Sequence, residues 1–169
     1  MFLSNVEDGT KIFIDANIFV YHFTANSRFN PSCTSFLESI EKGNIYGFTT
    51  ASVIQEAVHR IMIEEAALLL PDVKAKGLVK YLKTHHDVVK NLAINREVPS
   101  KIVRFNVEII PADIRIIEKS QLMKIQYGFL SNDALVLQVM KDFNISHLAS
   151  NDSDFERVDF ITLYKPIQK

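Results

Sequence analysis

Residues 11–17 read KIFIDAN, in which three apolar residues run directly into an aspartate. A short, continuous apolar run bounded by polar residues is typical of a strand that is buried on both faces. Such burial predicts a parallel sheet with helices above and below it, and in these sheets ligands bind at the carboxyl ends of the strands. Asp15 falls at that end. Its carboxylate suits either a binding site or the cap of the following helix, and this segment alone does not separate the two roles.

The composition describes one globular chain without a strong net charge. The sequence has 169 residues, of which 47% are hydrophobic, and its 19 basic and 20 acidic residues give a formal net charge of −1. This length fits a single domain, residues 1–169, with a real core. A near-neutral protein must meet a polyanion through a local basic patch.

Nothing in the sequence resembles a targeting or membrane segment. Acids stand near the N-terminus where a signal peptide has lysines, and the longest apolar stretch, residues 61–70, is interrupted by Glu64 and Glu65. The single cysteine, Cys33, fits a reducing compartment. We therefore expect a cytoplasmic protein with no membrane association.

Strands alternate with helices along the chain, which predicts an α/β fold, a three-layer α/β/α arrangement with a mostly parallel sheet of about five strands. Runs of β-branched and aromatic residues predict the strands, and apolar residues at helical spacing predict the helices. The expected strands cover residues 11–14, 45–49, 107–110, 147–150 and 160–164, and the expected helices between them begin near residues 18, 31, 53, 113 and 131.

A helical insertion near 64–104 interrupts this alternation. The stretch is long for one crossover, and we interpret it as a helical arm or hairpin, with breaks at Pro71-Asp72 and at Val98-Pro99-Ser100. Its apolar run at residues 66–70 fits either the core or a contact between two copies of the chain.

Four acids share one position relative to the expected strands. Asp15 follows the first strand, Glu56 opens the helix after the second, Asp133 opens a later helix, and Asp152 follows the fourth strand. In a parallel sheet all four approach the same edge, where carboxylates repel one another unless a cation neutralises them. Ligation by oxygen alone favours Mg²⁺ or Mn²⁺ over zinc.

Each acid also has a purely structural explanation. Glu56 fits a solvated helix residue, Asp133 a stabiliser of the first helical turn, and Asp152 with Asp154 a turn. The adjacent pair at residues 85–86, two histidines, diverges on a helix and forms no zinc clamp. The coincidence of four acids at one edge favours the metal site.

The acids and the segments around them resemble the PIN domain, a family of metal-dependent ribonucleases that includes the VapC toxins of prokaryotic toxin–antitoxin pairs. The resemblance covers nearly the whole chain, and the motifs that carry it are FIDAN at 13–17, Glu56, NDAL at 132–135 and SNDSDF at 150–155. By this resemblance the acidic quartet is Asp15, Glu56, Asp133 and Asp152, with Asp154 as a frequent fifth acid. Asn17, Ser131 and Asn151 match polar positions beside these acids. The insertion is longer than in a minimal toxin of this family, so the toxin assignment has less support than the nuclease assignment.

The resemblance implies an endoribonuclease that uses Mg²⁺ or Mn²⁺ to hydrolyse RNA phosphodiesters, leaving 5′-phosphate and 3′-hydroxyl ends. Asp15 and Asp133 are the expected main ligands and Asp152 completes the site, whereas Glu56 either ligates directly or acts through water as a general base. The implied partners are an RNA substrate, an antitoxin protein and a second copy in a homodimer. Two alternatives stay open: a PIN-like nuclease for DNA or structured nucleic acid, similar to 5′-nucleases, and a non-catalytic PIN scaffold, which is expected to have lost acids that this chain keeps.

An acidic site needs basic residues beside it to hold RNA. The candidates for phosphate contacts are Lys101, Arg104, Arg115, Lys119 and Lys124, and the candidates for base stacking are Tyr21, His22, Phe23, Tyr127 and Phe129. A solvated helix face for the first set and a core position for the second are the competing interpretations.

Overall fold

The computed structural model describes residues 1–24 and 27–168, and its centre is one sheet whose described strand pairs are all parallel. The strand order is β3-β2-β1-β4-β5. The strands are β1 (Lys11–Ile14), β2 (Tyr46–Thr50), β3 (Glu108–Ile110), β4 (His147–Ala149) and β5 (Thr162–Tyr164). The expected parallel sheet of about five strands is confirmed, and β1 forms its buried centre, as the apolar run at 12–14 predicted.

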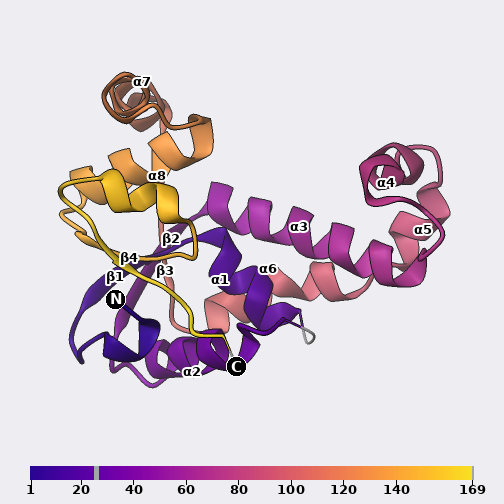
Figure 1. Cartoon of the computed structure of the whole chain (residues 1–169), viewed down its shortest axis with the longest axis horizontal. Helices are drawn as coiled ribbons and strands as arrows, with labels where there is room; N and C mark the ends of the chain where they lie inside the picture. The colour runs from indigo at the N-terminus through magenta and orange to yellow at the C-terminus, as the bar shows by residue number, and fades with distance from the viewer. Residues whose placement is uncertain (25–26, 169) are drawn as a thin grey trace.

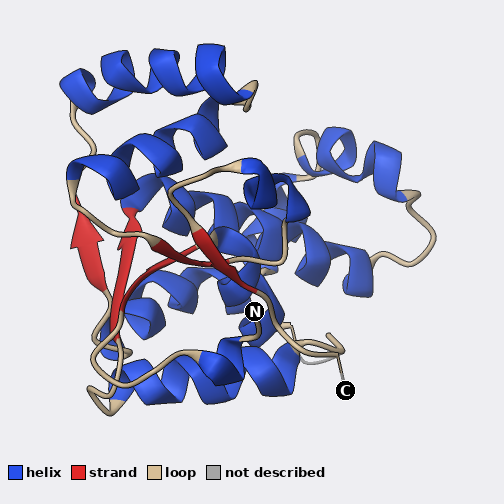
Figure 2. Cartoon of the chain, turned by 60° about the vertical axis from the view of Figure 1, so that its left-hand side comes forward, coloured by secondary structure: helices blue, strands red, loops and turns tan. Residues whose placement is uncertain are grey.

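Helices cover both faces of this sheet (Figures 1 and 2). On one side lie α1 (Ala16–Phe23), α2 (Asn30–Glu41), α3 (Ala51–Leu69) and α6 (Ile94–Arg104), and on the other α7 (Ile114–Tyr127) and α8 (Ser131–Asp142). Two short 3₁₀ helices, η1 (Leu3–Asn5) and η2 (Ser153–Arg157), complete the described elements near the sheet. The chain leaves β1 toward β2 and β3 and later returns on the other side of β1 as β4. Strand order therefore reverses between β1 and β4, which is where α/β sheets bind ligands.

The helical insertion forms an arm that projects from the sheet (Figure 1). The ends of α3 and α6 support α4 (Ala75–Leu82) and α5 (His86–Asn91), which pack on a small apolar cluster of their own. Four buried residues form that cluster: Ala66, Leu78, Leu82 and Leu92. The expected helical arm is confirmed, but the break expected at residues 98–100 is wrong, because Pro99 lies inside α6.

Two element boundaries bear on the site. Leu130 is the N-cap of α8, and Ser131, near which this helix was expected to begin, is its first helical residue. The strand expected at residues 45–49 begins one residue later, at Tyr46, and ends at Thr50. Thr50 is at the same time the N-cap of α3, where its side chain accepts a hydrogen bond from the N–H of Val53. This tight strand-to-helix connection holds the first turn of α3, and with it Glu56, beside the edge of the sheet.

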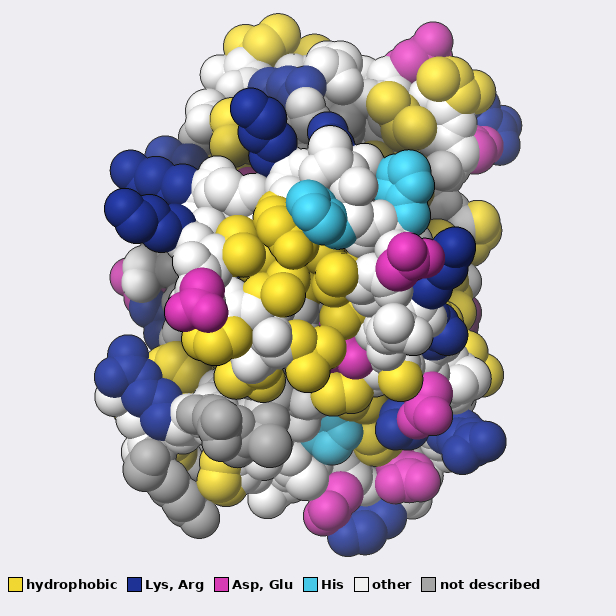
Figure 3. Space-filling view, turned by 90° about the vertical axis from the view of Figure 1, so that its right-hand side faces the viewer, with side chains coloured by type: hydrophobic (Ala, Val, Ile, Leu, Met, Phe, Trp, Pro, Cys, Tyr) yellow, Lys and Arg dark blue, Asp and Glu magenta, His cyan; other side chains and the backbone are white. Residues whose placement is uncertain are grey.

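The apolar run at residues 66–70 contains both buried and exposed side chains. Ala66 is fully buried in the arm cluster, whereas Leu68 and Leu69 are 68% and 60% exposed. Figure 3 shows hydrophobic side chains gathered in the middle of the face that the arm presents to solvent. Within the described residues, no helix combines the length and the hydropathy that crossing a bilayer demands.

Candidate active site

Asp15 is the first residue after the central strand, and three hydrogen bonds fix its carboxylate. Its Oδ1 accepts from the N–H of Ala16 (2.7 Å), which makes Asp15 the N-cap of α1. Its Oδ2 accepts from the Oγ of Ser150 (2.6 Å) and from the side-chain amide of Asn17. Asn17 also donates to Ser150 Oγ (2.9 Å), so a closed polar triangle joins the carboxyl ends of β1 and β4. Asp15 therefore caps a helix and lies at the switch point, which unites the two roles that the sequence left open.

The segment after β4 is held against this triangle. The N–H of Asn151 donates to Asn17 Oδ1 (3.1 Å), and the N–H of Asp152 donates to Ser150 Oγ (3.1 Å). Asp152 then caps η2 by accepting from the N–H of Asp154 (2.8 Å). Both aspartates are exposed at the edge of the sheet that Asp15 occupies. The turn role that the sequence allowed for them is present, and it keeps them at the site.

Glu56 lies in the second turn of α3 and is held between two helices. Its Oε2 accepts a hydrogen bond from the side-chain amide of Asn132 in α8 (3.1 Å), and its Oε1 lies 3.9 Å from a guanidinium nitrogen of Arg60, one turn further along α3. This contact links helices on opposite faces of the sheet across the end of the strands. Glu56 is thus oriented toward the other acids, and its position is fixed by Asn132.

The electrostatics show that the acids share one environment. Burial raises the pKa of Asp133 to about 6, together with the negative charges of Asp15, Asp152, Glu56 and Asp154. Burial also raises the pKa of Asp15, against the hydrogen bonds from Ser150 and Ala16, and the charge of Glu56 raises it further, whereas the charge of Arg60 lowers it. Carboxylates from four separate segments of the chain are therefore close enough to repel one another.

The donor set fits a hard divalent cation by its chemistry. Aspartate and glutamate oxygens are the ligands of Mg²⁺ and Mn²⁺, and a cation would relieve the repulsion that raises the pKa of Asp133. As the side chains stand, no three His, Cys, Asp or Glu groups among residues 1–24 and 27–168 are close enough together to enclose an ion. Asp15, Glu56 and Asp152 are instead bonded to neighbouring donors in the protein.

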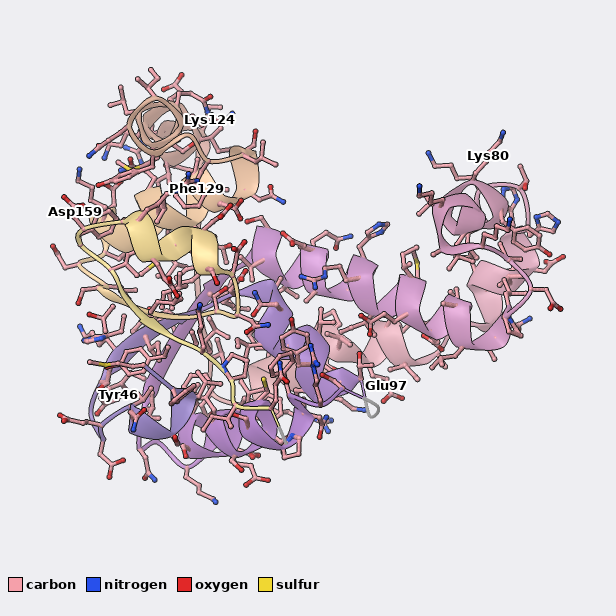
Figure 4. The ribbon with its side chains drawn as sticks, viewed as in Figure 1. Tyr46, Lys80, Glu97, Lys124, Phe129 and Asp159 are labelled. Carbon is pink, nitrogen blue, oxygen red and sulfur yellow. The ribbon has the colours of Figure 1, made fainter. Side chains whose placement is uncertain are left out.

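Several other predicted site residues lie in ordinary structural roles. Arg115 pairs with Asp113 (2.7 Å), Lys119 with Asp142 (2.9 Å) and Lys101 with Glu97 (2.7 Å). Figure 4 shows how far apart basic side chains lie, with Lys124 on α7 and Lys80 on the arm. Phe129 is buried and stacks on Phe155, and Tyr127 packs edge-on against Phe160 while its hydroxyl donates to Asp159. His22 and Phe23 pack against each other.

Ser150 and Arg60 are site residues that the sequence reasoning did not single out. Ser150 was part of a motif, but its contact with Asp15 joins residues 135 positions apart. Arg60 had a local signal, because a glutamate and an arginine four residues apart on a helix lie on one face. Conversely, Ser131 was expected beside the acids, and the residue that contacts Glu56 is its neighbour Asn132.

A parallel sheet with carboxylates around its switch point defines a class of α/β proteins whose reactions take place at that edge. A family model described as "PIN domain" matches residues 12–161, and the chain belongs to this family. The resemblance noted from the sequence motifs is thereby confirmed.

The relatives agree with this membership. Ribonuclease VapC2 of Methanocaldococcus jannaschii is 30% identical over 159 residues, a match that covers 90% of this chain and 92% of the relative. Ribonuclease VapC6 of the same organism is 24% identical over 157 residues, covering 92% and 97%.

Solved structures share the fold at lower identity. Mycobacterium tuberculosis VapC20, titled a sarcin–ricin loop cleaving toxin, superposes with a TM-score of 0.60 at 13% identity, over 89% of this chain and 96% of that one. A chain of Rickettsia felis VapBC2, a complex bound to a promoter DNA fragment, gives a TM-score of 0.53 at 16% identity, over 94% and 100%. These two similarities show the fold alone.

Proposed function

We propose that this protein is a metal-dependent endoribonuclease whose active site is the cluster of Asp15, Glu56, Asp133, Asp152 and Asp154. The observation that carries the proposal is the convergence of carboxylates from four segments of the chain at one edge of the sheet, where burial and the charges of the other four acids raise the pKa of Asp133. Membership of the PIN family and similarity to proteins named ribonucleases support RNA as the substrate.

In this proposal Asp15 and Asp133 are the main ligands of Mg²⁺ or Mn²⁺, and Asp152 and Asp154 complete the ligand set. A cation held by these acids would supply charge neutralisation at the scissile phosphate and lower the pKa of a bound water molecule. Ser150 and Asn17 hold the Asp15 carboxylate in one orientation, so that little reorganisation is needed when substrate arrives.

The reaction is hydrolysis. A water oxygen bonds to phosphorus, the bond from phosphorus to the 3′ oxygen breaks, and the products carry a 5′-phosphate and a 3′-hydroxyl. Glu56 is placed by Asn132 to accept the proton of the attacking water, and it reaches the cluster from a different helix than the main ligands.

The test is a digestion that compares single-stranded RNA, structured RNA and DNA, with Mg²⁺ and with a chelator. We expect cleavage of RNA that the chelator abolishes. Cleavage of DNA alone would favour the 5′-nuclease-like alternative, and no cleavage of any substrate would favour a non-catalytic scaffold.

We further propose that the protein is the toxin of a toxin–antitoxin pair, with an antitoxin as its protein partner and a homodimer as its assembly. The relatives named VapC and the solved VapBC2 complex support this role. Exposed apolar side chains for such contacts occur on the arm, at Leu68 and Leu69, and on α7, where Leu122 and Ile125 are 63% and 83% exposed. Co-expression with the product of the adjacent reading frame, followed by measurement of mass in solution, tests both contacts.

A further inference from the structure

Helices α1 and α3 run side by side in the same direction away from the acidic cluster. Near the start of these helices, Asp15 at the N-cap of α1 and Glu56 in the second turn of α3 interact through their charges. At the far end of α1 the hydroxyl of Thr24 donates a hydrogen bond to Glu64 Oε2 on α3. The two helices therefore form a track that begins at the acids and ends at Thr24 and Glu64.

One face of α3 carries charged residues along this track. Glu56, Arg60 and Glu64 are spaced by four residues, so they follow one another on the same side of the helix. Arg60 lies between the acids and Glu64, and its guanidinium is partly exposed. The track thus offers a cation one helical turn beyond the acids, where a backbone phosphate next to the cleaved one would lie.

An open cavity of about 470 Å³ lies at the end of the track. Its lining, among the described residues, is Tyr21, Thr24, Ser27, Arg28, Phe29 and Glu64. The volume falls within the range of pockets that hold small ligands. A hydrogen bond links one lining residue to the acidic site: the Tyr21 hydroxyl accepts it from the side chain of Asn151, the neighbour of Asp152 (3.1 Å).

The lining combines groups that recognise a nucleobase. The ring of Tyr21 is half-buried and tilted against Phe29, with centroids 4.8 Å apart, so that it is held rigidly while part of it faces the opening. The exposed Arg28 places its guanidinium 5.3 Å from the centroid of the same Phe29 ring. Aromatic rings and arginine planes are the groups on which unpaired bases stack.

Glu64 gives the lining a group that can distinguish the bases by their hydrogen-bonding edges. Its carboxylate is held by Thr24 at the wall of the cavity and offers acceptors only. Guanine presents two adjacent donors on its Watson–Crick edge, N1–H and the N2 amino group, which match the two oxygens of a carboxylate. Adenine, cytosine and uracil each present only one donor group on that edge, flanked by acceptors, so none of them offers a donor to both oxygens of a carboxylate.

We propose that this cavity is a guanine-binding subsite, which reads one base of the RNA near the cleaved phosphate. The inference rests on the proposed ribonuclease function, since it assigns part of the substrate to the same site. Along α1, Tyr21 is six residues beyond Asp15, or about 9 Å at the helical rise, so the base it reads belongs to a nucleotide near the cleaved bond.

The first test is the sequence of the fragment ends that the wild-type protein and Glu64→Gln produce from one RNA pool with Mg²⁺. The wild type is expected to show guanine at one fixed position. Glu64→Gln is expected to lose this preference, with kcat/KM reduced about tenfold for guanine-containing substrates and unchanged for substrates without guanine at that position. Glu118→Gln, a substitution of an exposed glutamate on α7, is the matched control and leaves both values unchanged. An equal loss of activity on all substrates would make Glu64 a structural residue and overturn the proposal, as would wild-type cleavage without guanine preference.

The second test does not depend on cleavage. Guanosine 5′-monophosphate, titrated into the metal-free wild-type protein, is expected to shift the NMR signals of Tyr21 and Thr24. Adenosine, cytidine and uridine monophosphates at the same concentration are expected to leave those signals in place. Equal responses to all four nucleotides, or none, would contradict the guanine subsite. If the protein cleaves no RNA but binds guanosine monophosphate in this way, the ribonuclease proposal fails and the subsite stands.

Discussion

Asp133 at the edge of the sheet is partly buried and Glu65 in the arm is buried, but their surroundings shift the pKa values of these two carboxylates in opposite directions. Glu65 is 9% exposed, and it accepts hydrogen bonds from the backbone N–H groups of Ala93 (2.7 Å), Ile94 (3.1 Å) and Asn95 (3.3 Å) and from the Asn95 side chain (3.1 Å). Burial alone would raise the pKa of Glu65, but these donors hold it below its ordinary value. Burial and four neighbouring acids instead raise the pKa of Asp133 to about 6.

The opposite pKa shifts distinguish a carboxylate that stabilises the fold, Glu65, from carboxylates that suit a binding site, those around Asp133. Glu65 satisfies the open N-terminus of α6 and ties it to α3, so its negative charge stabilises the arm. The acids around Asp133 carry more negative charge than their neighbouring cation, Arg60, offsets, and such an arrangement is typical of functional sites. A bound cation, alone or together with substrate, would supply the missing positive charge at this edge of the sheet.

The largest expected effect comes from removing one charge at the sheet edge. Asp15→Asn should lower ribonuclease activity by roughly 10² to 10³-fold, because a central oxygen ligand and its orientation are lost. The free energy of unfolding of the metal-free protein should not fall, since asparagine also caps helices and a desolvated charge is removed. Initial cleavage rates and urea denaturation measure the two effects. Full activity in this variant would show that Asp15 is outside the active site.

In the arm, the main expected effect of removing a carboxylate is a loss of stability. Glu65→Ala should lower the free energy of unfolding by about 3 kcal/mol, because it leaves the N–H groups at the start of α6 without their charged acceptor. Glu97→Ala is the matched control: Glu97 is an exposed glutamate on α6 paired with Lys101, and its removal should lower the free energy of unfolding far less. Urea denaturation followed by circular dichroism compares them. Equal costs would show that the hydrogen bonds of Glu65 contribute no stability.

The pH dependence of this contribution has a defined direction. The pKa of Glu65 is lower in the folded state than its ordinary value of 4.5. Its stabilisation is therefore fully present above pH 4.5 and is lost as the pH falls through the lowered folded pKa. The difference in stability between the wild type and Glu65→Ala should shrink below that pH, and a difference that grows in acid would contradict this assignment.

Asp133 should show the reverse behaviour in the metal-free protein. Its folded pKa of about 6 lies above the ordinary value of 3.8, so its ionisation opposes folding as the pH rises between these values. Titration of the Asp133 side-chain carboxyl by NMR should give a midpoint near pH 6. Asp152→Asn should lower that midpoint, because it removes one of the repelling charges. A midpoint near 4 in the wild type would mean that the acids do not interact.

The smallest expected effect concerns Arg60, whose charge lowers the pKa of Asp15 and whose guanidinium lies 3.9 Å from Glu56. Arg60→Ala should raise KM for RNA a few-fold and reduce the slope of log KM against log salt by about one, because one phosphate contact is lost. Arg60→Lys should retain most of the salt slope. An unchanged slope in Arg60→Ala would place this side chain outside the RNA-binding surface.

The sequence predicted the strands well because apolar β-branched runs form buried strands, which is a local pattern. The acids were expected at one edge because Asp15 and Asp152 follow strands in the chain, whereas Glu56 and Asp133 lie near the start of helices. The parallel sheet and the arm could be anticipated in outline from the alternation of strands and helices. The proline break at residues 98–100 was wrong because the packing of Val98 and Ile102 in the core maintains α6 through Pro99.

The contacts that orient the site could not be predicted in the same way. The bond from Ser150 to Asp15 and the bond from Asn132 to Glu56 join residues 135 and 76 positions apart, and only the folded sheet brings them together. The role of Glu65 could not be predicted either, because in the sequence this residue only interrupts an apolar stretch. Long-range polar contacts carry no periodic signal, so they become visible only in three dimensions.

A calorimetric titration of the metal-free protein with Mn²⁺, at pH 6 and at pH 8, tests most directly whether the acids at the sheet edge form a cation site. Binding should be weaker at pH 6, where Mn²⁺ has to displace the proton of Asp133, and Asp133→Asn should abolish most of it. Equal Mn²⁺ binding by the wild type and Asp133→Asn, or no binding by the wild type at either pH, would contradict the account.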